Sequence, residues 1–102
     1  MITSYSVSGW LLINHEGKNT FTKLGEIKDC FSYGQCLEEV NTMLAEDKDI
    51  LGAYLEVKTT KKTYIDGDEF IHEDINIETA GLLDEEQIKS LEDHILIHNN
   101  KA

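Results

Sequence analysis

Hydrophobic and polar residues change their spacing several times along this chain, and each change predicts a different element. Tyr5 and Val7 alternate with serines and lead into the apolar run Trp10-Leu11-Leu12-Ile13. This pattern predicts a strand over residues 5–13 that begins half exposed and ends buried. A turn cluster with Gly17 follows over residues 14–19, and residues 20–22 then begin a return strand. Residues 23–29 fit no single pattern, so we predict an N-terminal hairpin whose far end is undefined.

An amphipathic helix is predicted after Ser32, ending near residues 46–48. Ser32 and Gln35 have the spacing of a capping box, in which each side chain binds the other residue's backbone N–H. Apolar side chains then recur within an arc of about 120° around the helix axis. They are Tyr33, Cys36, Leu37, Val40, Met43 and Leu44. The helix is expected to bury this side and to expose the opposite, acidic side.

A second hairpin is predicted downstream. Residues 50–57 have the composition of a strand, residues 59–62 interrupt it with polar side chains, and Asp66-Gly67-Asp68 is a turn signal. A second strand is predicted over residues 70–77. Ile71, Ile75 and Ile77 share one parity there, so this strand has an apolar face and a polar face.

The last element is predicted to be a helix capped by Asp84, with Gln87 at the third position and Leu82 or Leu83 as the hydrophobic staple. Its buried stripe is expected to contain Ile88, Leu91 and Ile95, so Ile97 would point away from it. Three alternatives fit Ile97: a frayed helix end, a short extended segment over residues 95–98, or contact with a partner. We favour the helix.

The predicted order is ββα-ββα, a single α+β domain over residues 1–102. We expect a four-stranded, mainly antiparallel sheet covered by two amphipathic helices.

Charge narrows the range of functions. The chain carries 20 acidic residues against nine basic ones, which gives a net charge of −11, and every basic residue is a lysine. Residues 1–31 are neutral, whereas residues 63–102 hold eleven acids and two lysines. Because nucleic acids are polyanions that arginine and lysine neutralise, direct nucleic-acid binding is disfavoured.

The segment around Met1 has no basic region, so we expect no secretory signal. The apolar runs are far shorter than the ~20 residues that a membrane span needs. With two cysteines there is no disulfide scaffold, so we expect a reducing cytoplasm and no membrane association.

Catalytic and metal-binding patterns are weak. His94 and His98 are four residues apart on the predicted helix, as in a zinc pair, but Cys30 and Cys36 lack the spacing of a zinc knuckle. A calcium loop starting at Asp66 would carry Phe70 and Ile77 where oxygen ligands are required. The chain also lacks a nucleophile elbow, a glycine-rich phosphate loop and the H-E-x-x-H motif. We therefore expect a non-enzymatic protein without a catalytic residue, cofactor or metal.

Our first functional hypothesis is a small acidic inhibitor that binds a basic protein. If both helices cover one side of the sheet, their acidic faces are neighbours and approach the charge density of DNA. A decoy of this kind would block a nuclease or another nucleic-acid-processing enzyme, as small phage inhibitors of restriction or CRISPR nucleases and nuclease immunity proteins or antitoxins do. The expected contact residues are Glu38, Glu39, Glu46, Asp47, Asp66, Asp68, Glu69, Glu73, Asp74, Glu85, Glu86, Glu92 and Asp93.

The alternative hypothesis is a structural or assembly module whose main contact is apolar. Ile97, or the apolar edge of the first hairpin, would then form a homodimer or subunit contact, and the acidic residues would serve solubility.

Overall fold

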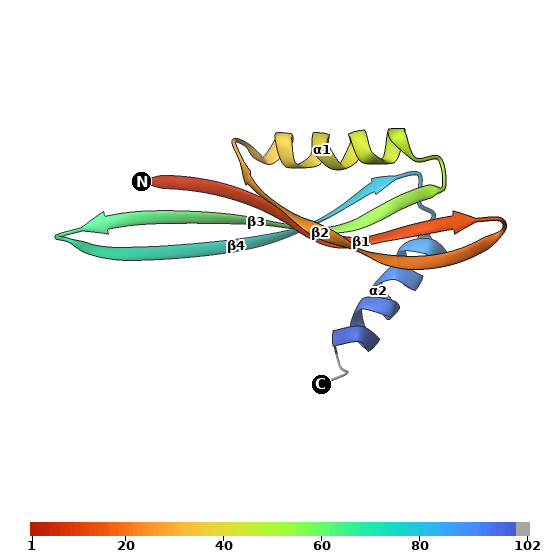
Figure 1. Ribbon diagram of the computed structural model, residues 1–102. Helices are drawn as coiled ribbons and strands as arrows, with labels where there is room; N and C mark the ends of the chain where they lie inside the picture. The colour runs from red at the N-terminus through yellow and green to blue at the C-terminus, as the bar shows by residue number, and fades with distance from the viewer. Residues whose placement is uncertain (100–102) are drawn as a thin grey trace.

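The computed structural model describes residues 1–99, with the exception of the side chain of Asp29. It has a four-stranded antiparallel sheet in the order β2-β1-β3-β4 and two helices, which confirms the predicted α+β class and element order (Figure 1). The elements are β1 (Ile2–His15), β2 (Lys18–Cys30), α1 (Tyr33–Glu46), β3 (Ile50–Ile65), β4 (Asp68–Gly81) and α2 (Glu85–Asn99). Neither helix in the described part of the chain is long and apolar enough to cross a membrane.

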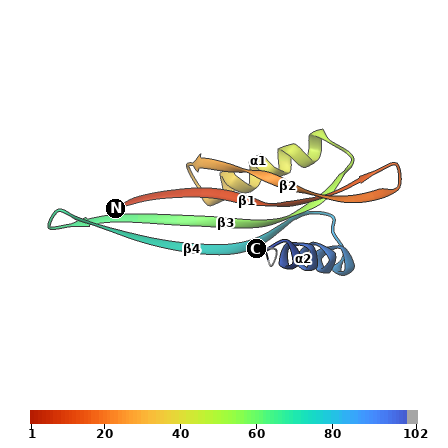
Figure 2. The same ribbon diagram turned by 60° about the horizontal axis from the view of Figure 1, so that its bottom comes forward.

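The strands are longer than the hydrophobic pattern predicts. The β2 strand covers the whole undefined stretch, and β3 continues through the polar residues 59–62. These polar residues stay in the strand because β3 pairs with β1 on one side and β4 on the other, so both neighbours supply backbone hydrogen bonds. The second hairpin thus projects well beyond the helices and makes the molecule elongated, 58 × 33 × 20 Å (Figures 1 and 2).

The main core lies between α1 and one face of the sheet. Val7, Leu55 and Val57 from the central strands are fully buried there, together with Cys36 and Val40 from α1. The two central strands approach each other closely at Gly9, where a Cβ atom would collide with the carbonyl oxygen of Tyr54. Gly9 also has φ +156°, a conformation that side-chain-bearing residues rarely adopt, so both observations require glycine.

The α2 helix packs on the face of the sheet opposite α1 (Figure 2), so the condition under which the acidic faces of the two helices would be neighbours is not met. The reason lies in β1, whose run Trp10-Leu11-Leu12-Ile13 sends apolar side chains to both faces. Leu11 faces the α1 core, and Leu12 on the other face is only 2% exposed. Because α1 covers only the face of Leu11, the face of Leu12 needs a second helix. The α2 helix packs there and buries Leu91.

Both predicted helix starts are present, but the capping box predicted for α1 is only half formed, because Gln35 binds the backbone N–H of Phe31 and not that of Ser32. Gln35 N–H donates to Ser32 Oγ at 3.1 Å, and Gln35 Oε1 accepts a hydrogen bond from the backbone N–H of Phe31. The Asp84 and Gln87 side chains each bind the other residue's backbone N–H, at 2.8 and 2.9 Å. This reciprocal pair is the capping box predicted for α2.

The α2 helix continues through Ile97 to Asn99, so the favoured helical alternative is correct, and the Ile97 side chain is exposed. Of the two staple candidates, Leu82 is almost fully exposed, whereas Leu83 packs over Gly52 in β3.

Candidate protein-binding surfaces

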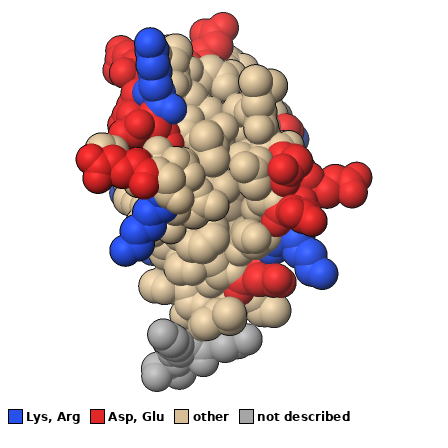
Figure 3. All heavy atoms as spheres, turned by 90° about the vertical axis from the view of Figure 1, so that its right-hand side faces the viewer, with Lys and Arg blue, Asp and Glu red and all other residues tan. Residues whose placement is uncertain are grey.

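The predicted contact residues occupy three separate surfaces instead of one. Glu38, Glu39, Glu46 and Asp47 lie on or at the end of α1, above the sheet, and all are exposed. Glu85, Glu86, Glu92 and Asp93 lie on α2, below the sheet, and are also exposed. In the end-on view, carboxylates lie on both flanks together with a few lysines, and a largely uncharged surface separates the flanks (Figure 3). The two helices therefore do not build the side-by-side acidic ridges that the sequence suggested.

The third group lies on the projecting second hairpin. Asp66 is in its turn, and Asp68, Glu69, Glu73 and Asp74 follow on β4. We call these five residues the acidic edge, because β4 is an outer strand of the sheet. It pairs with β3 on one side and, within residues 1–99, has no strand on the other. All five residues are exposed.

The acidic edge presents charge on both faces of the sheet. Cross-strand partners point to the same face, so Asp74, paired with Thr59, faces the side of α1. Glu73, paired with Thr60, faces the side of α2. The outer rim of β4 is therefore negative from either side.

Few lysines neutralise these carboxylates locally. Among the side chains that the structure describes, lysine and carboxylate groups approach within 4.0 Å only in the pairs Lys28–Glu26 and Lys62–Glu69. All four side chains are at least two-fifths exposed, and exposed pairs of this kind contribute about 0–1 kcal/mol. His72 Nε2 also lies 3.2 Å from Asp74 Oδ1. Most of the negative field of the acidic edge is thus directed to solvent.

His94 and His98 belong to an aromatic cluster between α2 and the sheet. The His94 ring stacks on Phe21 with centroids 4.4 Å apart and meets the edge of Trp10 at 4.7 Å. His98 meets Trp10 at 4.9 Å. Among the described residues, no group of three or more histidine, cysteine or carboxylate side chains has the arrangement of a metal site. The two rings fill the space that anchors α2.

A small hollow of about 160 Å³ opens beside this cluster, with Trp10, Tyr54, Glu56 and His98 among its walls. Burial raises the pKa of Tyr54, and the neighbouring carboxylates of Glu92 and Glu56 raise it further. This volume is below the range of about 300–1,000 Å³ that is typical of small-molecule sites.

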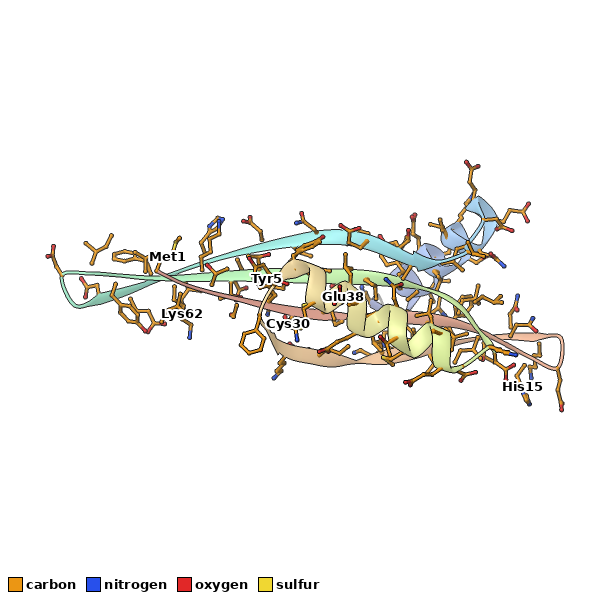
Figure 4. The ribbon with its side chains drawn as sticks, turned by 90° about the horizontal axis from the view of Figure 1, so that it is seen from above. Met1, Tyr5, His15, Cys30, Glu38 and Lys62 are labelled. Carbon is orange, nitrogen blue, oxygen red and sulfur yellow. The ribbon has the colours of Figure 1, made fainter. Side chains whose placement is uncertain are left out.

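The two cysteines lie in the α1 core, as predicted for Cys36. Both are free and buried, and Cys30 lies at the end of β2, below the start of α1 (Figure 4). Burial, followed by a hydrogen bond with Cys30, raises the pKa of Cys36 to about 12. A thiol with this pKa is protonated at neutral pH and is a poor nucleophile.

A row of exposed apolar side chains on the second hairpin is the feature that sequence reasoning missed. Ile71, Ile75 and Ile77 of β4 are 49–59% exposed, although their alternating pattern is typical of a half-buried strand. The first hairpin, which the alternative hypothesis named, instead buries Leu12 and Leu24. The mismatch between the β4 pattern and its exposure becomes visible only when the position of both helices is known.

Comparisons with protein-family models, with curated proteins and with solved structures found no match to this chain.

Proposed function

We propose that this protein is a non-enzymatic inhibitor that binds a basic protein through its acidic edge and thereby blocks a surface used for nucleic acid. The observation that carries the proposal is the concentration of exposed carboxylates on one projecting strand, where Glu69 has the one lysine contact and Asp74 the one histidine contact among the described side chains. Residues 63–81 hold six acids and no lysine. The free, buried cysteines support a reducing cytoplasm as the place of action.

The arrangement of the acidic edge suits docking into an open basic cleft. The hairpin projects past both helices, so it reaches a recessed surface without interference from them (Figure 1). Complementary fields of this kind accelerate association and make binding sensitive to salt.

The charge density supports the broad class of inhibitor better than close mimicry of a duplex. From Asp68 to Glu78, β4 carries five carboxylates. At about 3.4 Å per residue this is one charge per roughly 7 Å. One strand of duplex DNA carries a phosphate every ~3.4 Å. We therefore expect a partner that binds the separated carboxylates of β4 and also contacts the backbone edge of this strand.

Affinity capture from source-cell lysate, with the wild-type chain as bait, tests this proposal. At ~0.5 M salt the screening length falls to about 4–5 Å, so an electrostatic partner captured at low salt should be depleted. The captured protein is then tested for displacement by an unlabelled 30-base-pair DNA duplex. Capture at low salt, loss at high salt and displacement by DNA are the expected results.

Two charge-matched variants locate the contact. The test variant D68N/E69Q/E73Q/D74N and the control variant E85Q/E86Q/E92Q/D93N each remove four charges, so both carry a net charge of −7 instead of −11. The test variant should lose its partner and the control variant should keep most of its binding. Equal binding by the two variants, or a partner that DNA does not displace, contradicts the proposal.

A further inference from the structure

The exposed isoleucines of β4 belong to a larger uncovered face. This face lies on the α2 side of the sheet, beyond the end of α2 itself, and consists of side chains from β1, β3 and β4 in register. Its four rows are Ile2–Lys62–Ile71, Ser4–Thr60–Glu73, Ser6–Lys58–Ile75 and Ser8–Glu56–Ile77. We call these twelve residues the neutral face.

The charge balance of the neutral face differs from that of the rest of the protein. It holds two lysines, Lys58 and Lys62, and two glutamates, Glu56 and Glu73, so the net charge of these twelve residues is zero. The next row outward on the same side adds Glu69, whose carboxylate lies 4.0 Å from Lys62 Nζ. The whole chain carries −11. Two copies of the chain repel each other over most of their surfaces, but this repulsion is absent where one neutral face meets another.

The hydrophobic pattern indicates that the neutral face is covered. Alternation of apolar and polar residues is the pattern of a strand with one buried face. The isoleucine side chains of β4, Ile71, Ile75 and Ile77, all point to the neutral face. No other part of residues 1–99 covers them. Ile2 at the start of β1 adds a fourth side chain, 60% exposed. A patch of this kind typically marks an interaction site.

The order of charges along β3 fits a second copy related by a two-fold axis. We consider a two-fold axis that lies in the plane of the interface and runs perpendicular to the strands. This axis reverses the order of the rows in the second copy. The first row of one copy therefore faces the fourth row of the other, and the second row faces the third. Lys62 then faces Glu56 of the second copy, and Ile71 faces Ile77. In the two middle rows, Lys58 faces Thr60 and Glu73 faces Ile75, so Lys58 and Glu73 come to lie on neighbouring strands. Such an interface is self-complementary, as a two-fold dimer requires.

Edge-to-edge pairing is the other route by which two sheets associate, and the charges oppose it. Two β4 strands side by side would bring two acidic edges together, and charged residues on an outer strand are a common protection against such pairing. The face-to-face route avoids this repulsion. It also extends toward α2, where Leu96 is exposed and borders a hollow with Tyr54 and Glu56.

We propose that this protein forms a two-fold homodimer in which the neutral faces of two copies pack against each other, with Lys62 of one copy against Glu56 of the other. This inference does not depend on the proposed inhibitor function, because of the five acidic-edge residues only Glu73 belongs to the neutral face. Sedimentation equilibrium on the purified chain, from micromolar to millimolar concentration, tests it. We expect a monomer–dimer equilibrium.

Two threonine variants locate the interface. Ile75→Thr removes apolar area from the neutral face, whereas Phe70→Thr removes a side chain of similar exposure, 54%, from the opposite face of the same strand. Threonine keeps the strand propensity of both positions. Ile75→Thr should weaken dimerisation about a hundredfold, because a two-fold interface loses the side chain twice. Phe70→Thr should leave it within about threefold.

A charge exchange tests the predicted pairing directly. Lys62 and Glu56 are six residues apart on β3, about 20 Å, so they do not interact within one chain. Lys62→Glu and Glu56→Lys should each weaken the dimer, and the double variant should restore it. A wild-type chain that stays monomeric at millimolar concentration overturns the proposal and leaves the face to another partner. The proposal is also overturned if Phe70→Thr weakens dimerisation more than Ile75→Thr does. It is overturned as well if the double charge variant dimerises no better than the two single variants.

Discussion

The attachment of α2 to the sheet depends on very few side chains, and Leu91→Ala tests this dependence. Leu91 is the one buried residue of α2 within residues 1–99, and it is fully buried. The remaining anchor is the aromatic cluster, in which His94 packs against Trp10 and Phe21. Truncation of Leu91 leaves a cavity at the centre of this small interface.

The expected cost follows from the size of the deletion. Leu→Ala substitutions at buried sites destabilise by about 2–5 kcal/mol, and ~3 kcal/mol lowers an equilibrium constant roughly a hundredfold. An isolated helix of this length is marginal in water. Because the α1 core shares no buried side chain with α2, we expect α2 to detach and unfold while the α1 core stays intact.

Two signals report this event. The single tryptophan, Trp10, lies in the cluster, so its fluorescence should shift to longer wavelength when α2 detaches. The helices have 14 and 15 residues, so about half of the helical circular dichroism should be lost. Hydrogen exchange should accelerate in α2 and stay slow in β1 and β3.

The matched control is Leu96→Ala, the same change at a position of α2 that is 61% exposed. It should alter stability by no more than about 0.5 kcal/mol. A Leu91→Ala variant that keeps the wild-type fluorescence and helix content would show that α2 does not depend on Leu91. Loss of the entire fold in a single transition would contradict the expected detachment of α2, because α2 would then be part of one cooperative unit with the α1 core.

Three further predictions concern the fold. Gly9→Ala should destabilise by at least about 2 kcal/mol in urea unfolding, whereas Gly25→Ala, at a position with open space for a Cβ, should have little effect. Ser32→Ala should cost about 1 kcal/mol through loss of the α1 cap, and Ser32→Asp should retain most of the stability. Burial and the hydrogen bond to Glu78 raise the pKa of Tyr33 to about 12, so its contribution to stability is present below pH 10 and declines between pH 10 and 12. Unfolding measured across this range should show a shallower decline in Tyr33→Phe, and an unchanged slope would contradict this assignment.

Tyr33 shows how the two levels of information combine. Its helical spacing with Cys36 and Val40 identifies it as part of the buried stripe of α1. The fold adds a hydrogen bond of 2.5 Å from its hydroxyl group to Glu78 Oε1, 45 residues away on β4. The sequence pattern indicates that the ring is covered, but only the pairing of β4 with β3 brings that carboxylate to it.

The type and order of the elements could be predicted from local patterns along the chain. Apolar periodicity and the capping residues at Ser32 and Asp84 act within one turn of the chain, so they are readable locally. The turn at Asp66-Gly67 is equally local, with both residues at positive φ. The undefined end of β2 and the polar part of β3 could not be predicted in this way. Their strand structure depends on hydrogen bonds with strands that are distant in the sequence.

Which faces of the sheet are covered and which are exposed depends on the packing of the two helices, and no local pattern predicts it. The apolar run of β1 required cover on both faces, but the sequence does not state which helix takes which face. The α2 helix packs on the face around Trp10, so its acidic residues lie on the other side of the sheet from those of α1. The helix ends before it reaches Ile71 and Ile75, which stay exposed. The acidic edge and the neutral face are both consequences of this placement, because exposure depends on what packs against a strand and not on the strand's own residues.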